Sequence, residues 1–293
     1  MIELKEIKIS DKEFFSKFLP ESENSMMNFT TIFAWSANGK IKYDIVDDCL
    51  VLFFKSSKNG VCCTYPQGDG NRVEAAKKAL SYMKENSKKP RFILMTEDNA
   101  KELYENFGNK FKICSNRDSA DYVYLSEDLI NLSGKKFHQK KNHLNAFLNT
   151  YQYEYKKIED ENINECIDLL DKWLKTQPPE VVEYSKIPSL RILENAKELG
   201  VTVGGIYVDG ELIAFSVGEA QTPNMALIHL EYANTEYRGA FNIINQQFTK
   251  NEWSSFKYIN REEDMGIEGL RKAKMAYRPV KMIEKYYGEY KGR

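Results

Sequence analysis

Polar side chains that could bind an anion or move a proton concentrate between Asn260 and Asp264. This segment contains an amide, an arginine and three carboxylates, and it follows an apolar and aromatic run at 256–259. The run predicts a short buried strand, and ligand sites of α/β proteins are commonly assembled where such strands end. The same pattern is also typical of a solvated turn in which Asp264 accepts hydrogen bonds from the first amides of a helix. The residues alone leave both interpretations open.

A helix is predicted directly after this turn. Apolar residues recur near helical spacing over 267–277, so Arg271 and Lys274 lie on neighbouring turns of one face. The guanidinium of Arg271 is well suited to phosphate because its fork of donors matches two oxygens. We therefore expect an anionic ligand beside the carboxylates of the preceding turn.

His229 and Glu231 are a second pair of residues whose side chains could take part in binding or catalysis. They alternate with apolar neighbours in a predicted strand, and a period of two places both on one face. The chain then passes through Arg238 and Gly239 into a helix predicted from Phe241 to Glu252, and backbone amides at a helix start bind phosphate groups. The alternative is that His229 and Glu231 are partly buried strand residues with local hydrogen bonds.

A third candidate is a basic helix predicted over 135–148. Its cationic and titratable residues are Lys135, Lys136, His138, Lys140, Lys141 and His143, with few acids nearby. Most charge runs of this kind are solvated helix faces. A helix can also offer lysines to the phosphates of RNA or to a lipid headgroup. Steep salt dependence of binding would favour the second interpretation.

Composition restricts the class of protein. In 293 residues, 42% are hydrophobic and 29% are charged, which excludes wholesale disorder. The net charge of -1 means that a polyanionic partner would need a local basic patch. Five cysteines without metal-ligand spacing are expected to be reduced thiols. With neither a signal peptide nor a run of about 18 apolar residues, we expect a cytoplasmic protein.

Periodicity predicts six strands and four helices up to residue 150. The predicted strands are 2–9, 41–46, 50–54, 61–65, 92–95 and 122–125. The predicted helices are 11–19, 72–86, 99–107 and the basic helix, with turns at 47–48 and 56–60.

The remainder shows a comparable order. Predicted strands are 151–158, 201–208, 212–219, 226–232, 256–259 and 280–287, and predicted helices are 163–176, 188–199, 241–252 and 266–277. Pro178-Pro179 is expected to break the chain, and Asp209-Gly210 to close a hairpin. This order suits an α+β fold of the GNAT (acyl-CoA N-acyltransferase-like) type. We expect two such domains in tandem, 1–150 and 151–293, each with a mixed, mostly antiparallel sheet flanked by helices.

Four stretches together resemble one known family. They are 134–147, 229–234, 237–246 and 258–279, the last including Tyr277-Arg278-Pro279. In order and spacing they are similar to the C-terminal domain of bacterial phosphatidylglycerol lysyltransferases and to related tandem GNAT proteins. Full lysyltransferases of this family carry many transmembrane helices before the domain, and none is predicted here.

The resemblance implies a transferase with most of its site in the second half. Its donor would be aminoacyl-tRNA or acyl-CoA, with no permanently bound cofactor and no metal, and peripheral contact with anionic lipid remains open. The sequence does not give the acceptor or the oligomeric state. In GNAT enzymes the unit around Arg238 and Gly239 holds the pyrophosphate of coenzyme A, but its loop is shortened here.

The resemblance also suggests roles for single residues. Asp264 and Glu231 are candidates to orient the nucleophile or take its proton, with a pKa that rises if the site is dry. Arg271 and Lys274 would bind phosphate or stabilise charge, and Asn260 would position donor or acceptor. Two other functions stay open: an ordinary acetyl-CoA N-acetyltransferase, and a non-catalytic protein that binds an anion or nucleotide.

Overall fold

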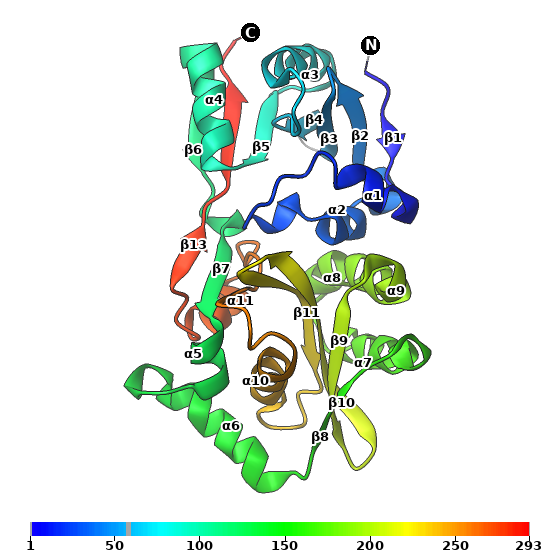
Figure 1. Ribbon diagram of the computed structural model, residues 1–293, viewed down its shortest axis with the longest axis vertical. Helices are drawn as coiled ribbons and strands as arrows, with labels where there is room; N and C mark the ends of the chain where they lie inside the picture. Colours follow the sequence, from blue (N-terminus) through cyan, green and yellow to red (C-terminus); the bar gives the residue numbers. More distant parts are fainter. Residues whose placement is uncertain (1, 57–59, 293) are drawn as a thin grey trace. The chain divides into compact units, whose positions relative to one another are not determined.

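The chain forms two compact units whose boundaries differ from the expected division at residue 150. The computed structural model describes residues 2–56 and 60–292. The first unit comprises the residues up to Ala120 together with those from Ile283 onward, and the second comprises Asp121–Met282 (Figure 1). The boundary lies at residue 120 because the strand that follows it pairs within the second sheet: Tyr258, Ile259 and Asn260 face residues 123–125.

The first unit is built on a sheet of order β1-β2-β3-β4-β5-β14-β6. Its strands are β1 (Lys5–Glu6), β2 (Ile41–Val46), β3 (Cys49–Ser56), β4 (Gly60–Thr64), β5 (Arg91–Met95), β6 (Phe111–Ser115) and β14 (Tyr286–Tyr290). Its helices are α1 (Lys12–Phe15), α2 (Phe29–Trp35), α3 (Arg72–Asn86) and α4 (Glu97–Phe107). Among these strands only β4 and β5 are parallel neighbours, because α3 crosses over between them.

Helix α3 shows how local sequence positions this unit. Asn71 caps it by accepting a hydrogen bond from the Glu74 amide at 3.1 Å. The side chains buried along one face are Ala75, Ala76, Ala79, Leu80 and Met83. They pack with the inward residues of β3, β4 and β5 in a single core cluster. The predicted bounds of this helix are confirmed.

The C-terminal strand could not be placed from the sequence. A single strand was expected at 280–287, and the structure has two, β13 (Lys281–Ile283) and β14. Strand β13 is next to β7 in the second sheet, whereas β14 lies between β5 and β6 in the first, antiparallel to both. The last residues therefore complete the interior of the first sheet.

The second unit is built on a sheet of order β13-β7-β12-β11-β10-β9-β8. Its other strands are β7 (Asp121–Leu125), β8 (Glu154–Lys157), β9 (Thr202–Val208), β10 (Glu211–Thr222), β11 (Met225–Ala233) and β12 (Tyr258–Asn260). Its helices are α5 (Ser126–Asn131), α6 (His138–Thr150), α7 (Ile163–Leu174), α8 (Pro179–Glu194), α9 (Ala196–Leu199), α10 (Ala240–Glu252) and α11 (Glu268–Met275). Figure 1 shows α10 and the helices α7–α9 on opposite sides of strands β9–β11.

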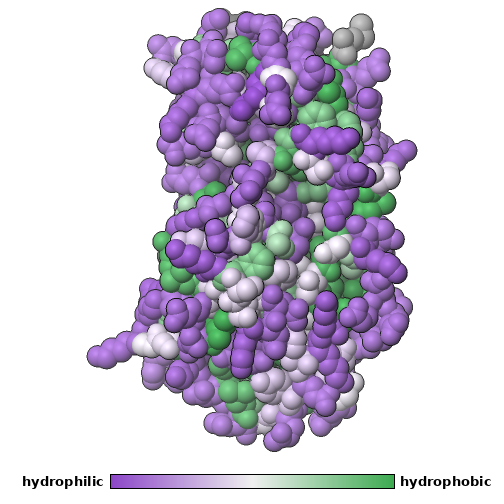
Figure 2. Space-filling view, in the orientation of Figure 1, coloured by the Kyte–Doolittle hydropathy of each residue, from purple (hydrophilic) through white to green (hydrophobic). Residues whose placement is uncertain are grey.

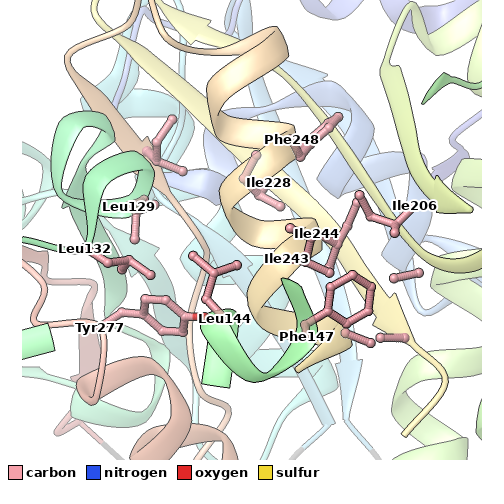
Figure 3. Close-up of a cluster of buried hydrophobic side chains, with 14 of the residues drawn as sticks. Leu129, Leu132, Leu144, Phe147, Ile206, Ile228, Ile243, Ile244, Phe248 and Tyr277 are labelled. Carbon is pink, nitrogen blue, oxygen red and sulfur yellow. The ribbon is translucent and has the colours of Figure 1, made fainter. Parts of the chain in front are cut away.

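Helix α10 joins the sheet to the basic helix α6. It buries Ile243, Ile244 and Phe248 in the same core cluster that receives Leu144 and Phe147 from α6. Figure 3 shows Tyr277 beside Leu132 and Leu144 at one end of this cluster. The basic helix is thereby fixed against the sheet through its apolar side, and its lysines lie on the remaining faces.

Several expected elements need correction. The strand expected at 2–9 is reduced to β1. Helix α8 begins at Pro179, where a break in the chain was expected, and it continues through Pro188, where a new helix was expected to start. Proline is tolerated in the first helical turn because the amide it lacks would have no partner there. Short elements α2, α5 and β6 were not predicted. The turn expected at 56–60 lies mostly outside the described residues.

The α+β class with two mixed, mostly antiparallel sheets is confirmed. Hydrophilic side chains cover most of the face drawn in Figure 2, as expected where apolar side chains gather in cores. Among the helices that the structure describes, none has the length and apolar character needed to cross a bilayer.

Packing around β14 gives a testable expectation. A Cβ atom at Gly288 would lie 2.6 Å from Leu103 Cδ2, and at Gly269 in α11 it would meet nothing within 4 Å. We expect Gly288→Val to lower the free energy of unfolding by about 1–3 kcal/mol through overpacking. Gly269→Ala should be neutral or raise it by up to about 1 kcal/mol. Denaturant unfolding measures both, and equal stability of the two variants would contradict this packing.

Candidate functional site

Strands β11 and β12 separate where the candidate site begins. They run parallel and pair only from Met225–Tyr258 to Leu227–Asn260. Beyond that point side chains connect the two segments, with Arg261 Nη2 2.7 Å from Glu231 Oε1. The carboxyl ends of parallel strands joined by a crossover helix are where ligands enter such sheets.

His229 lies between two carboxylates at this separation. Its Nε2 is 2.8 Å from Glu219 Oε1 and its Nδ1 is 3.0 Å from Glu262 Oε1, and only 1% of its side chain is exposed. Burial alone would lower the pKa of His229, but the two carboxylate partners outweigh it and raise the pKa to about 9. A ring that donates from both nitrogens cannot accept a proton at neutral pH. His229 therefore links β11 to β10 and to the segment after β12.

Glu231 is held by partners on both of its oxygens. Arg261 Nη2 donates to Oε1, and Asn245 Nδ2 on α10 donates to Oε2 at 3.1 Å. The guanidinium also lies over the rings of Tyr124 and Tyr277, at 5.6 and 5.0 Å from their centroids. Burial opposes the charge of Arg261, but Glu231 raises its pKa further. Glu231 is thus the counter-ion of a largely buried arginine.

Lys140 reaches the same ring from the basic helix. Its Nζ lies 4.4 Å from the centroid of Tyr277. Within the described ranges this amine has no hydrogen-bond or ion-pair partner. Partial burial lowers the pKa of Lys140, and the positive charge of Arg261 lowers it further, while Glu231 opposes. We define the Tyr277 cluster as Lys140, Glu231, Asn245, Arg261 and Tyr277.

The Tyr277 cluster holds two cations and one carboxylate. Tyr277 is 5% exposed, and its hydroxyl accepts a hydrogen bond from Asn242 Nδ2 in the first turn of α10 at 2.9 Å. Burial raises the pKa of Tyr277 despite the opposing charge of Arg261, so the phenol stays neutral. The excess positive charge can hold an anionic group or stabilise an oxyanion in a place where water screens poorly.

Asp264 lies in a separate, filled network. The carboxylate is fully buried and binds Arg271 through two hydrogen bonds of 2.8 Å, and it also accepts from the Gly266 amide and the Tyr122 hydroxyl. Burial would raise the pKa of Asp264, but these donors, Arg271 first among them, hold it well below its ordinary value. The expected rise in pKa is therefore wrong for this residue. A carboxylate of such low basicity is poorly suited to take a proton.

Lys274 and Asn260 support the backbone of the same segment. Lys274 Nζ donates to the carbonyls of Arg261, Glu262 and Glu263. Burial, followed by the charge of Arg261, lowers the pKa of Lys274 to about 8. Asn260 accepts from the Glu262 amide at 2.8 Å and donates to Asp121. These contacts fix the main chain that carries Arg261.

The start of α10 packs directly on α6. Gly239 has a φ of +90°, and a Cβ there would lie 2.5 Å from the His143 carbonyl oxygen. Arg238 is exposed. Of the three lysines singled out on the basic helix, Lys136 pairs with Asp128 at 2.8 Å and Lys141 is exposed. Lys140 is the one whose amine enters the Tyr277 cluster.

Three members of the cluster were not singled out from the sequence. Arg261 stands beside the residues that were chosen, and Asn245 and Tyr277 lie within stretches that carry the family resemblance. Neither charge pattern nor periodicity distinguishes them, because their importance arises from contacts among α6, α10, β11 and the end of β12. The resemblance was the available signal.

Comparisons with known proteins agree with this architecture. The sequence model described as "Phosphatidylglycerol lysyltransferase, C-terminal" matches residues 18–288. A conserved protein of unknown function from Bacteroides thetaiotaomicron VPI-5482 is 33% identical, with a TM-score of 0.87 over 99% of this chain and 100% of that one. L-PGS from Bacillus licheniformis is 17% identical, with a TM-score of 0.67 over 100% and 95% of the two chains.

Two further comparisons concern a solved structure with a similar fold and a relative that matches over only part of its length. FemX has a TM-score of 0.59 at 11% identity, over 98% of this chain and 97% of that one, which supports the two GNAT-like sheets in tandem. An uncharacterized protein of Mycoplasmoides gallisepticum is 25% identical over 171 residues, 57% of this chain and 55% of that protein. The chain thus spans about half the length of that curated relative. Together the structural matches agree on the fold of this chain.

The charge state of His229 makes stability depend on pH. Its pKa is raised from 6.5 to about 9, so its contribution is complete below pH 6.5 and is lost as the pH rises through 9. We expect the difference in unfolding free energy between the wild type and His229→Gln to shrink by up to about 3 kcal/mol across this range. Chemical denaturation at several pH values measures it. The exposed His138→Gln is the control, and a difference independent of pH would contradict the assignment.

The contact between α10 and α6 can be tested with paired glycine substitutions. Gly210 has a φ of +82° but open space around it, whereas Gly239 has both a positive φ and a close backbone neighbour. Gly210→Ala should cost about 1 kcal/mol of stability from the backbone conformation alone. Gly239→Ala should cost about 1–3 kcal/mol more, because α6 must move. Equal losses in denaturant unfolding would show that α6 does not pack closely there.

Proposed function

This chain belongs to the family of phosphatidylglycerol lysyltransferase C-terminal domains, and from that membership we propose that it transfers an aminoacyl or acyl group at the Tyr277 cluster. The donor is an aminoacyl-tRNA or an acyl-CoA, and the acceptor is an amine or hydroxyl. Both donors carry a reactive carbonyl on a phosphate-bearing carrier. The observation that carries the proposal is that Lys140 and Arg261 both lie near the ring of Tyr277, while the carboxylate of Glu231 pairs with Arg261 alone.

The chemistry follows from that charge excess. The acceptor nitrogen or oxygen attacks the carbonyl carbon, and the carbonyl oxygen gains negative charge. The bond from carbon to the carrier's ribose oxygen or thiol sulfur then breaks, and the proton lost by the acceptor ends on the leaving group. Lys140 and Arg261 would stabilise the oxyanion, an effect of about 3–4 kcal/mol for a well-placed donor. Tyr277 would supply a flat, water-excluding surface beside them.

The remaining candidate residues take supporting roles in this proposal. Glu231 keeps the guanidinium of Arg261 in place and balances part of its charge. Asp264 with Arg271, and Lys274 with Asn260, hold the segment from which Arg261 projects. Gly239 lies at the contact of α6 with α10, and Lys136 pairs with Asp128. We assign the two exposed cations, Arg238 and Lys141, to the phosphates of the carrier.

A transfer assay tests the function. Labelled aminoacyl-tRNAs and acyl-CoAs would be incubated with the purified chain and separate acceptor fractions: phosphatidylglycerol vesicles, peptides and polyamines. We expect transfer from one donor class, and a reduction in kcat of about 100-fold in Lys140→Gln because one oxyanion donor is lost. Lys250→Gln, which removes an exposed lysine of α10, should keep wild-type turnover.

Two results would overturn the proposal. One is the absence of transfer from every donor by a folded protein. The other is wild-type turnover by Lys140→Gln. Donor binding should also weaken steeply with salt, because contacts to phosphates release counter-ions; a flat dependence would remove tRNA from consideration.

A further inference from the structure

Exposed lysines gather at one end of the first sheet, in a part of the first unit that the proposed transfer does not use. They come from the last turn of α3, the segment between α3 and β5, the residue before β6 and the residue after β14. These residues are Lys84, Lys88, Lys89, Lys110 and Lys291. We define them as the lysine patch.

Backbone contacts bring these segments together. The Tyr290 amide donates to the Pro90 carbonyl at 3.0 Å, so the end of β14 lies beside the segment that follows α3. The Lys291 amide donates to the Lys110 carbonyl at 2.8 Å, which places the start of β6 on the other side of β14. Lys84 reaches the same strand from α3, with its Nζ 4.4 Å from the centroid of the Tyr290 ring. The patch is therefore formed by folding, because its lysines come from distant parts of the chain.

The positive charge of the patch is not neutralised locally. Within residues 2–56 and 60–292 none of its amines has an ion-pair partner, whereas Lys77 on the same helix α3 pairs with Glu74 at 2.6 Å. Glu289 on β14 is engaged by Arg91, whose Nε donates to it at 2.6 Å. In the described segments 84–91 and 289–291 the only other acid is Glu85. Positive charge therefore predominates at this end of the sheet.

Helix dipoles explain only part of this arrangement. A cation stabilises the last turn of a helix, and the effect fades beyond that turn. It accounts for Lys84 but not for Lys89, which precedes β5 by two residues, or for Lys291, which follows β14. Like charges gathered in one region also repel one another and destabilise the folded state. The stability of the first unit therefore does not account for the patch.

We infer that the lysine patch binds the phosphate backbone of RNA. Lysine neutralises phosphates as a point charge, whereas protein–protein interfaces are depleted in lysine and enriched in arginine. A membrane surface fits less well, because the described segments 84–91 and 289–291 carry no large apolar side chain exposed for insertion. The choice of RNA over DNA rests on the proposed function, in which the aminoacyl donor is carried by RNA.

The dimensions of the patch suit several phosphates of one strand. In the first sheet β5, β14 and β6 are consecutive neighbours. Adjacent strands lie about 4.8 Å apart, so a row of lysines across these three strand ends spans about 10 Å. Charges on one nucleic-acid strand recur about every 3.4 Å along the helix axis. The row can therefore meet about three phosphates, and it would do so without reading the base sequence.

Binding of an RNA that carries no amino acid tests this surface apart from catalysis. The probe is a fluorescently labelled RNA hairpin, and anisotropy gives its Kd at several salt concentrations. The patch variant combines Lys88→Gln, Lys89→Gln and Lys110→Gln. We expect it to bind the hairpin at least about 10-fold more weakly than the wild type at low salt. The slope of log Kd against log salt should fall by about 2–3, because each lost phosphate contact releases about one counter-ion fewer.

A matched control removes the same charge elsewhere in the first unit. The control variant combines Lys5→Gln, Lys8→Gln and Lys17→Gln, all at exposed positions. It should keep the wild-type affinity and salt slope. Equal behaviour of the two triple variants overturns the inference, and so does a wild-type protein that fails to bind the hairpin. Retained RNA binding with loss of binding to phosphatidylglycerol vesicles in the patch variant also overturns it, because the patch would then contact a membrane.

These outcomes are separate from those of the proposed function. The hairpin carries no acyl group, so its binding does not depend on transfer. RNA binding that weakens in the patch variant of a protein without transfer activity supports the inference and rejects the enzyme. Transfer by a protein that does not bind the hairpin supports the enzyme and rejects the inference.

Discussion

The ion pair of Arg261 with Glu231 is the interaction on which the second unit's site depends. The guanidinium is largely removed from water beside the rings of Tyr124 and Tyr277, and Glu231 supplies its compensating charge. Removing one partner of such a pair leaves an uncompensated charge, at a cost of about 3–5 kcal/mol. The pair also fills the space where β11 and β12 stop pairing. The candidate site and the fold of the second unit therefore both require the charge of Arg261 to be paired with that of Glu231.

Most of the polar residues that the sequence singled out as candidates hold the backbone around the ion pair of Arg261 and Glu231 in place. Asp264 and Arg271 form an ion pair, and Lys274 donates hydrogen bonds to the backbone carbonyls of residues 261–263. His229, charged between Glu219 and Glu262, ties the same segment to β10 and β11. Their charges are matched locally, which leaves the excess positive charge at Lys140 and Arg261. A dense polar motif can thus be mainly structural while its neighbour remains available for a ligand.

Stability and function compete in the Tyr277 cluster. Asn245 Oδ1 and Arg261 Nη1 are buried and have no hydrogen-bond partner within the described residues. A protein selected for stability alone would pair both atoms, because each unmet buried group costs about 1–3 kcal/mol. It would also give Lys140 an acid partner. Functional sites commonly keep such local conflicts, since groups already satisfied by the protein cannot bind a ligand. The surrounding core of α6, α10 and the sheet compensates for them.

The sequence by itself determined the α+β class, the bounds of α3 and the β9–β10 hairpin, because periodicity, capping and turn chemistry act over a few residues. The resemblance added the family. Tertiary structure alone decided that β14 enters the first sheet, that the units divide at residue 120, and that Lys140 and Arg261 both lie near the ring of Tyr277. These features rest on pairing between distant segments, and many pairings satisfy the same local pattern. Only the packed chain selects one of them.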